Sequence, residues 1–241
     1  MSTTKWKEIL DLVDDFADKC TGPIWFRGHS KTTHSLKSGL FRLRLNNIDD
    51  YLALEQQFYN HYKSLGHLLH NGEAGWSLLY SMQHYGVKSR LLDWTESFSV
   101  ALFFAARHWT GSNSACIWLL NPIELNYRSI GERKISIPTT LQLPYAASNT
   151  TAIYPIKNTN RIAVQHGVFT VQGNTLLSLD QEFDPTLIHN GILTKIDLPF
   201  DVREDVCRFL KKNGINHFSL FPDMEGLSTF LNQTLIQPAW E

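Results

Sequence analysis

One stretch decides the fold: residues 82–106, with the sequence MQHYGVKSRLLDWTESFSVALFFAA. Its second half, residues 100–106, is apolar on every side, and a helix of that kind is buried over most of its surface. We therefore predict a helix at the centre of the fold, with Asp93, Thr95 or Ser97 as its N-cap. A short strand over residues 89–94 precedes it. Before that strand, residues 76–85 form a predicted helix that ends at Gly86.

Outward from this stretch, short strands and helices are interleaved without a regular βαβ rhythm. Further strands are predicted over residues 24–27, 115–121, 160–172, 192–198 and 218–221, with a bulge at His166-Gly167. Further helices are predicted over residues 6–17, 50–69, 201–212 and 223–235. Residues 29–47 look like loop with short helical pieces. Residues 126–150 form a long polar connection, which in a compact domain is functional or a flap. The pattern favours an α+β fold.

Composition limits the class of protein. The 241 residues fit one domain, 1–241, with residues 1–22 as an N-terminal helix that packs on it. The net charge of −1 argues against a purely electrostatic grip on nucleic acid or membrane, although residues 126–164 are locally basic and 178–205 locally acidic. Three widely spaced cysteines without a CxxC motif indicate a reducing compartment. No apolar stretch is long enough to cross a membrane. We expect a soluble, cytoplasmic protein with no membrane partner.

The first polar motif is Trp25-Phe26-Arg27-Gly28-His29-Ser30. Arg27 lies at the end of a predicted strand, and its guanidinium offers a rigid, planar set of donors suited to phosphate or carboxylate. Gly28 follows at once and lets a ligand approach the backbone closely. The structural alternative is an arginine that pairs with a core carboxylate beside a turn glycine.

The second polar motif spans Gln83 to Thr95 and lies between two apolar helices, so some of its polar groups must be partly buried and need partners. One interpretation is a structural ion pair between Arg90 and Asp93, with Asp93 capping a helix. The other is a ligand pocket with an aromatic wall. The two are compatible.

The third polar motif is the segment Arg161-Ile162-Ala163-Val164-Gln165-His166-Gly167. Arg161 and Gln165 lie on a predicted strand with a bulge. A bulge changes the direction in which side chains point, and bulges are common near active sites. The alternative is a sheet edge with solvated polar residues.

These motifs resemble the FRG domain family, named for the tripeptide seen here as Phe26-Arg27-Gly28. The resemblance is carried by WFRGHS (25–30), MQHYGVKSRLLDWTESFSVALFFA (82–105), ACIWLLNP (115–122), RIAVQHGVFTV (161–171) and LFPDMEGL (220–227). It spans residues 24–230 approximately. Where family members usually carry Pro-Thr before the arginine, this chain has Lys88-Ser89. The family recurs in bacterial, phage-linked and defence-associated settings, which implies a toxin or antiphage effector.

At the level of the fold, the order of parts is similar to ADP-ribosyltransferases of the Arg–Ser–Glu type, which implies a split β-sheet flanked by helices and NAD as the substrate. Arg27-Gly28 resembles the first element, where the arginine holds the phosphate or ribose of NAD and the glycine backbone grips the nicotinamide amide. Leu91 to Thr95, leading into the apolar helix, resembles the second. Gln165 stands where the third element supplies glutamate.

The departures from that pattern matter for the chemistry. Asp93-Trp94-Thr95 replaces Ser-Thr-Ser, and Gln165 replaces glutamate, so the third element has no charge to stabilise a cation. Asp93 can supply a carboxylate from the second strand instead. If Asp93 is paired with Arg90, the site binds NAD-like ligands without turning them over.

We assign Arg27, Asp93 and Gln165 as catalytic residues. Residues expected to bind NAD are Gly28, His29, His84, Tyr85, Arg90, Trp94, Thr95 and Arg161. We expect a nucleotide-type small molecule as the ligand, a protein or nucleic-acid acceptor of unspecified class, and no metal. Two other functions stay open: a non-catalytic module that binds a nucleotide or a protein, and a metal-dependent hydrolase or nuclease using His29, His84, Asp93 and His166. No HExxH motif supports the hydrolase.

Overall fold

A six-stranded antiparallel sheet forms the centre of the computed structural model, which describes residues 2–111, 113–143, 145 and 147–236. The strands are β1 (Trp25–His29), β2 (Leu91–Thr95), β3 (Ala115–Leu120), β4 (Thr151–Ile153), β5 (Gly167–Val171) and β6 (Leu193–Leu198), in the order β4-β5-β2-β1-β3-β6. Eleven α-helices and a 3-10 turn (η1, Phe200–Val202) surround the sheet within the described residues. The predicted α+β class is confirmed.

The sheet is one open sheet, but its two halves are joined narrowly. β1 pairs with β3 over five positions, from Trp25–Leu120 to His29–Cys116. On its other edge β1 pairs with β2 at one position only, Phe26 with Thr95. β2 in turn pairs with β5 over its whole length. The halves β4-β5-β2 and β1-β3-β6 therefore meet at a seam rather than along a full ladder.

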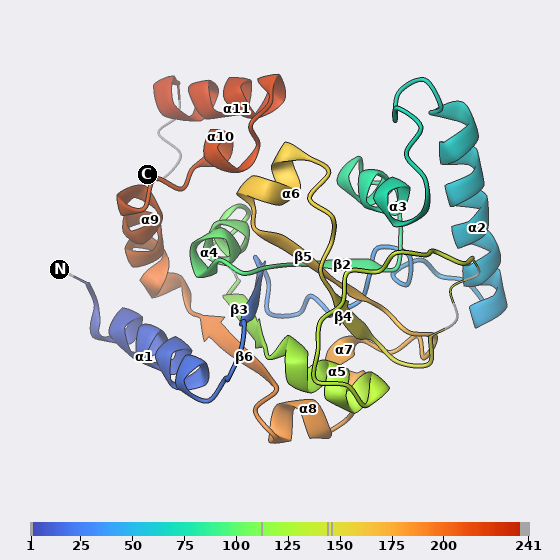
Figure 1. The fold of residues 1–241 in the computed structure, drawn as a ribbon. Helices are drawn as coiled ribbons and strands as arrows, with labels where there is room; N and C mark the ends of the chain where they lie inside the picture. The colour runs from blue at the N-terminus through green and yellow to red at the C-terminus, as the bar shows by residue number, and fades with distance from the viewer. Residues whose placement is uncertain (1, 112, 144, 146, 237–241) are drawn as a thin grey trace.

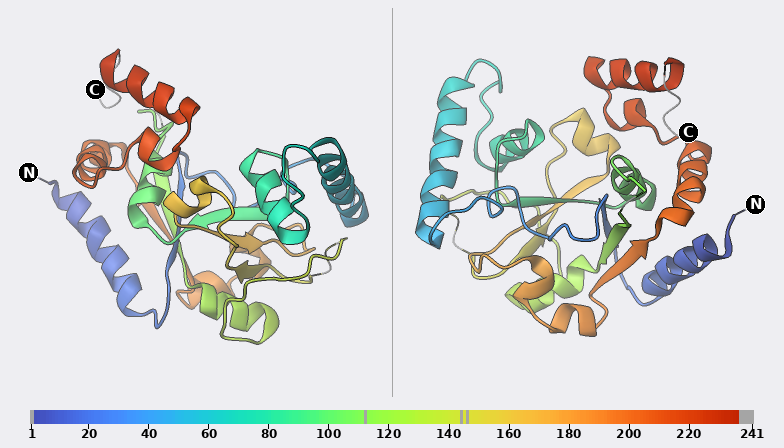
Figure 2. Two further views of the ribbon diagram at one scale, coloured as in Figure 1. Left: turned by 45° about the horizontal axis from the view of Figure 1, so that its top comes forward. Right: turned by 180° about the vertical axis from the view of Figure 1, so that it is seen from behind.

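Helices cover the two halves of the sheet from different sides (Figures 1 and 2). α1 (Thr4–Asp18), α4 (Phe98–Ala106) and α9 (Arg203–Lys212) pack around the half formed by β1, β3 and β6. α2 (Ile48–Leu65) and α3 (Gly75–His84) lie beside the half that contains β2 and β5. The predicted central helix is α4, because its buried side chains meet both α1 and α9 as well as the sheet. Its N-cap is Ser97, one of the predicted candidates, which accepts from the N–H of Val100.

Smaller elements complete the fold around the sheet. They are α5 (Pro122–Ile130), α6 (Asn160–Val164), α7 (Leu179–Glu182), α8 (Thr186–His189), α10 (His217–Leu220) and α11 (Met224–Leu235). The opposite face of the sheet carries its own apolar cluster, built around Trp25, Trp94 and Trp118. None of the described helices is long and apolar enough to cross a membrane.

One predicted strand, residues 218–221, and the first part of another, residues 160–172, are helical instead, and in both cases side-chain capping explains the helix. Residues 160–164 form α6 because the Thr159 side chain accepts from the N–H of Ile162 at 3.2 Å; the strand β5 begins only at Gly167. The predicted interruption at His166 is a left-handed residue, φ 48°, rather than a bulge within one strand. Residues 217–220 form α10 because Asn216 and Ser219 make a reciprocal capping box.

Other boundaries differ by less. α2 starts at Ile48 with Asn47 as its N-cap rather than Asp50, and it ends at Leu65 rather than Leu69. The predicted long connection, residues 126–150, begins inside α5, and Asn126 joins it to the sheet. The Asn126 amide donates to the carbonyls of Lys134 at 2.7 Å and Ala152 at 2.9 Å. These bonds fasten the start of the connection to the edge strand β4, and residues 144 and 146 of the connection lie outside the described residues.

Candidate functional site

A cavity of about 350 Å³ opens at the seam between β1 and β2. That volume lies in the range of small-molecule sites, roughly 300–1,000 Å³. Its wall is contributed by β1, β2, β5, α3, α4 and α6, and all three polar motifs of the sequence reach it. Aromatic rings of Phe26, Tyr80, Trp94, Phe104 and Phe169 form its apolar part.

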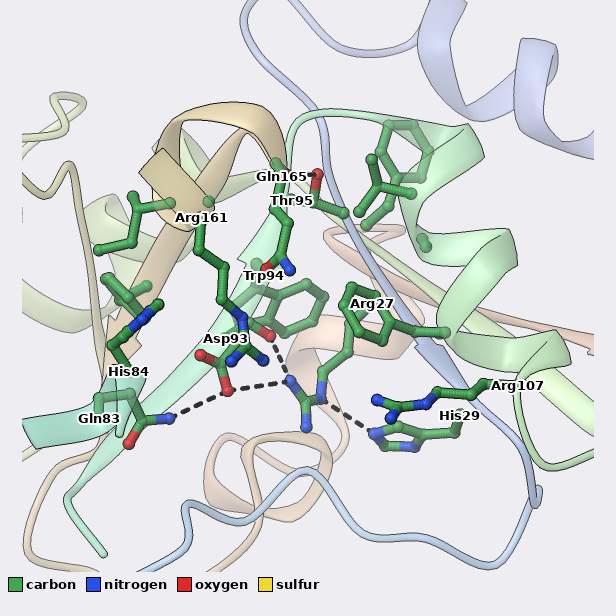
Figure 3. Close-up of a pocket in the computed structure, with 18 of the residues that line it drawn as sticks. Arg27, His29, Gln83, His84, Asp93, Trp94, Thr95, Arg107, Arg161 and Gln165 are labelled. Atoms are coloured by element: carbon green, nitrogen blue, oxygen red, sulfur yellow. Dashed lines mark hydrogen bonds and ion pairs between the residues drawn. The ribbon is translucent and has the colours of Figure 1, made fainter. Parts of the chain in front are cut away.

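The side chain of Arg27 replaces a backbone hydrogen bond that is missing between β1 and β2. If β1 and β2 continued in the register Phe26–Thr95, Gly28 would face Asp93. Instead the Arg27 Nη1 donates to the carbonyl oxygen of Asp93, in place of a backbone N–H. Figure 3 shows this contact together with the second one, from Arg27 Nε to His29 Nε2 at 3.0 Å. Arg27 is therefore both a structural tie across the seam and a cation at the cavity.

Asp93 supplies the negative charge of the cavity. Its side chain is 59% exposed, and its Oδ2 accepts from Gln83 Nε2 at 3.0 Å and lies 3.8 Å from Arg27 Nη1. Gln83 is itself held by Ser89, whose hydroxyl donates to the Gln83 Oε1 at 2.9 Å. A chain of Ser89, Gln83 and Asp93 thus fixes the orientation of the carboxylate while leaving much of it open to a ligand.

Two further arginines enter the cavity from other elements (Figure 3). Arg161 from α6 lies over the ring of Phe221 at 4.5 Å, and Arg107 after α4 lies over the same ring at 5.3 Å. Neither makes an ion pair within the part of the chain that the structure describes. Burial lowers the pKa of Arg161 against the opposing effect of Asp93. A partly desolvated cation such as Arg161 favours an anionic ligand.

Gln165 lies at the C-terminal end of α6 and points into the cavity beside Trp94 (Figure 3). Its side-chain Nε2 donates to the carbonyl of Leu220 at 2.9 Å, and its backbone carbonyl accepts from the Thr95 hydroxyl at 2.7 Å. The Thr95 hydroxyl also accepts from the N–H of Ser97 at 3.0 Å. Thr95 therefore ties the end of α6 to the start of α4, so its role in the structure is to position these elements.

The surroundings of three histidines at the cavity, His29, His34 and His84, favour their neutral form. Burial, followed by the charge of Arg27, lowers the pKa of His29 to about 3. This agrees with His29 Nε2 accepting from the Arg27 Nε–H. Burial and then Arg161 lower the pKa of His84, and burial and then Lys31 lower that of His34. Neutral imidazoles add donors and acceptors to the cavity without adding charge.

Gly28 faces α4 on the side where a side chain would stand. A Cβ at Gly28 would lie 1.8 Å from the carbonyl oxygen of Ala101 and 2.7 Å from the N of Ala105. The glycine is therefore required for the close approach of β1 to α4, which is a different reason from the ligand contact expected from the sequence. It remains part of the cavity lining.

The structure separates two of the predicted ligand-binding residues from the cavity. Arg90 is 1% exposed and pairs with Glu55 of α2, with Arg90 Nη2 at 2.7 Å from Glu55 Oε2. The interpretation of Arg90 and Asp93 as a structural pair is therefore wrong, because a buried carboxylate 35 positions earlier in the chain pairs with the guanidinium. Tyr85 is 73% exposed and packs edge-on against His84 rather than lining the cavity.

The remaining predicted residues lie together. Those at the cavity are Arg27, Gly28, His29, His84, Asp93, Trp94, Thr95, Arg161 and Gln165. Sequence reasoning missed Tyr80, Phe104, Arg107 and His108 as lining residues. Arg107 and His108 directly follow the apolar helix, and a cationic end to a buried helix was the available signal. His166 is exposed and lies outside the lining.

The sequence also leaves open a metal centre at His29, His84, Asp93 and His166. Within residues 2–111, 113–143, 145 and 147–236, no group of three or more His, Cys, Asp or Glu side chains could hold a metal ion. The histidines at the cavity instead face arginines, which disfavour a bound cation.

The geometry thus defines an α+β protein with a cationic cavity of small-molecule size at a seam in its sheet. Residues 22–114 match the family model of the FRG domain. The matched part includes β1, α2, α3, β2 and α4, and therefore Arg27 and Asp93, whereas Gln165 lies beyond it. This match supports the resemblance seen in the sequence. Searches of curated proteins and of solved structures each found no match.

Proposed function

We propose that the cavity binds a phosphate-bearing nucleotide of the NAD type and that the chain cleaves the bond between its ribose and nicotinamide, as an ADP-ribosyltransferase or NAD glycohydrolase does. The observation that carries the proposal is the convergence of Arg27, Arg107 and Arg161 on a cavity whose described lining has one carboxylate, Asp93. Three cations and one anion leave a net positive site that a pyrophosphate would neutralise.

The arrangement divides binding between two kinds of surface. Arg161 and Arg107 are free of ion pairs among the described residues, so they are available for phosphate oxygens. The apolar wall, with Phe104 and Trp94, suits the planar rings of a dinucleotide. His29 and His84, held neutral, offer hydrogen bonds to ribose hydroxyls without competing for the phosphates.

Asp93 is the proposed catalytic carboxylate. Cleavage breaks the bond from the ribose carbon to the nicotinamide nitrogen, and the electron pair of that bond leaves with nicotinamide. Positive charge then develops on the ribose, and a carboxylate held by Gln83 stabilises it. Water or an acceptor group forms the new bond to the same carbon and releases one proton. The acceptor is a protein or a nucleic acid in the transferase case.

Gln165 sets the expected level of activity. Its amide can hydrogen-bond a ribose hydroxyl but carries no charge, and its Nε2 is already used by the Leu220 carbonyl. Stabilisation of the cation therefore rests on Asp93 alone, so we propose slow turnover. The FRG resemblance extends the proposal to an effector in bacterial and phage conflict, acting in the cytoplasm, where NAD is available.

A second candidate function, a non-catalytic nucleotide-binding module, is favoured by that same observation. With Gln165 engaged by Leu220, the third segment supplies position rather than charge. The two candidates share the cavity and its ligand, and they differ only in whether nicotinamide is released.

The experiment combines thermal unfolding with a nicotinamide-release assay. NAD and ADP-ribose at about millimolar concentration should stabilise the protein, by about 2.7 kcal/mol when the ligand is at a hundredfold excess over Kd. Arg161→Gln should remove most of that stabilisation. Arg27→Lys should weaken binding through loss of the planar fork, with a smaller effect on unfolding. Arg44→Gln, which removes an exposed arginine outside the cavity, is the matched control.

Asp93→Asn separates the two candidates. In the enzyme it should abolish nicotinamide release and leave ADP-ribose binding nearly unchanged, because charge is lost while shape is kept. Release by the wild type that survives in Asp93→Asn would remove the catalytic role of Asp93. Stabilisation by NAD without release would establish the binding module. The absence of stabilisation by NAD, ADP-ribose and nicotinamide would overturn both.

A further inference from the structure

A second cavity, of about 300 Å³, adjoins the first at the C-terminal end of α4. The residues that line it include Arg107, His108, Trp109, Arg203, His217 and Gln233. They come from the end of α4 and the turn after it, from α9, α10 and α11. Arg107 and His108 also line the first cavity, so the two cavities are neighbours that share a wall.

No carboxylate lines the described part of this second cavity. Arg203 lies over the ring of Phe200 at 5.8 Å, and its Nε is buried without a hydrogen-bond partner. Neither Arg203 nor Arg107 forms an ion pair within the described part of the chain. A buried, unsatisfied guanidinium N–H costs free energy that a bound anion would recover.

The acidic residues near Arg203 in the chain are engaged elsewhere. Glu204 pairs with Arg208 at 2.6 Å. Asp205 accepts from the backbone N–H of Thr3 at 3.1 Å and lies 3.5 Å from Arg208 Nη1. The carboxylates of α9 therefore do not neutralise Arg203, although they stand next to it in sequence.

His217 adds a neutral polar group to the same wall. It is 8% exposed and stacks on Phe221, with ring centroids 4.6 Å apart. Burial and then Arg107 lower its pKa, while Asp223 acts in the opposite direction. Asp223 itself caps α11 by accepting from the N–H of Gly226 at 2.7 Å. His217 lines the second cavity, and its ring nitrogens make no hydrogen bond to the described residues.

We infer that the second cavity is a binding site for a phosphate group, held by Arg203 and Arg107 with His217 as a neutral hydrogen-bonding partner. The shared wall places this phosphate beside the ligand of the first cavity. It would then belong to a second substrate, a nucleotide or a nucleic-acid strand, a role that rests on the proposed function. Phosphate binding itself does not rest on it.

The test measures binding of pyrophosphate by isothermal titration calorimetry. We expect two sites per chain. Arg203→Gln should abolish or weaken one of them by about tenfold or more, and Arg27→Lys should affect the other. Lys211→Gln, which removes an exposed charge from the same helix, should change neither by more than about twofold. Arg203→Lys keeps the charge and should retain part of the affinity, which separates binding from folding.

Two further probes identify the source of the phosphate. The affinities for a short single-stranded DNA oligonucleotide and for AMP are compared in the wild type and in Arg203→Gln. Tighter, Arg203-dependent binding of the oligonucleotide indicates that the site takes a phosphodiester. Tighter, Arg203-dependent binding of AMP indicates a phosphomonoester. Pyrophosphate binding that is unchanged in Arg203→Gln overturns the inference, even where NAD binds the first cavity. If the wild type does not bind NAD but binds pyrophosphate in a manner that depends on Arg203, only the proposed function is overturned.

Discussion

The buried pair of Glu55 and Arg90 gives the sharpest prediction about stability. Both side chains are nearly inaccessible, at 2% and 1%, and Arg90 Nε and Nη2 meet the Glu55 carboxylate at 2.8 and 2.7 Å. Arg90 Nη1 also donates to the carbonyls of Tyr145 and Gln172, so one guanidinium joins α2, the connection before β4 and the end of β5. Glu55→Gln leaves this cation buried without its counter-charge.

Breaking a buried pair by removing one partner costs about 3–5 kcal/mol. For a domain of this size, about 2–4 °C of melting temperature accompanies each kcal/mol, so Glu55→Gln should lower the melting temperature by about 6–20 °C. Glu124→Gln is the matched control, because it breaks an exposed pair with Arg133 that contributes about 1 kcal/mol or less. Thermal unfolding and urea unfolding, each followed by circular dichroism, measure the melting temperature and the free energy of unfolding of both variants.

The same variant tests whether Arg90 belongs to the ligand site. Since Arg90 does not line the cavity, Glu55→Gln should keep its ligand affinity at temperatures where it is folded. A change of less than about 1 kcal/mol in the free energy of unfolding, or a loss of ligand binding by folded protein, would refute the assignment of Arg90 as a structural clamp.

Three further predictions follow from the site. Gly28→Ala should destabilise the protein by about 3 kcal/mol in urea unfolding, because the new Cβ meets the Ala101 carbonyl, whereas Gly111→Ala, with its nearest neighbour at 3.5 Å, should be nearly neutral. The pKa of His29 is lowered to about 3, so between about pH 6.5 and 3 the unfolded state binds a proton that the folded state does not. The free energy of unfolding should therefore fall by about 1.4 kcal/mol per pH unit as the pH drops through this range. His29→Gln should flatten that part of the stability profile. Gln165→Glu should raise nicotinamide release, or create it in a silent binder, while lowering the melting temperature because a carboxylate would face the Leu220 carbonyl; unchanged release would argue against a ribose-facing role.

Long apolar patterns made the centre of the fold predictable. The uniformly apolar run of α4 indicated a buried helix, and the strand before it was placed within two residues of β2. The short helices α6 and α10 were not predictable from periodicity, because they hold about one turn each and depend on single capping side chains, Thr159 and Asn216. Apolar residues within so short a helix look the same as those of a strand.

The site residues that were predictable are the polar residues that stand out within a short sequence motif. Arg27, Asp93 and Gln165 do line one cavity, although they come from three separate segments. Pairings between distant segments were not predictable. The partner of Arg90 is Glu55 in α2, and nothing local distinguishes it from Asp93, which is closer in sequence. Likewise the contact of Arg107 with the ring of Phe221, at 5.3 Å, joins two segments that are more than 100 positions apart in the chain.

The seam between β1 and β2 has a mechanical consequence. One backbone pair and the side chain of Arg27 connect the two halves of the sheet along this line, where a full ladder would have supplied several bonds. A ligand that touches Arg27 on one side and Asp93 on the other bridges the same line. Its binding free energy then adds to the cohesion between the halves, so occupancy of the cavity should slow hydrogen exchange in strands as far away as β6 and β4. Ligand binding would then be detectable as reduced flexibility of the whole sheet.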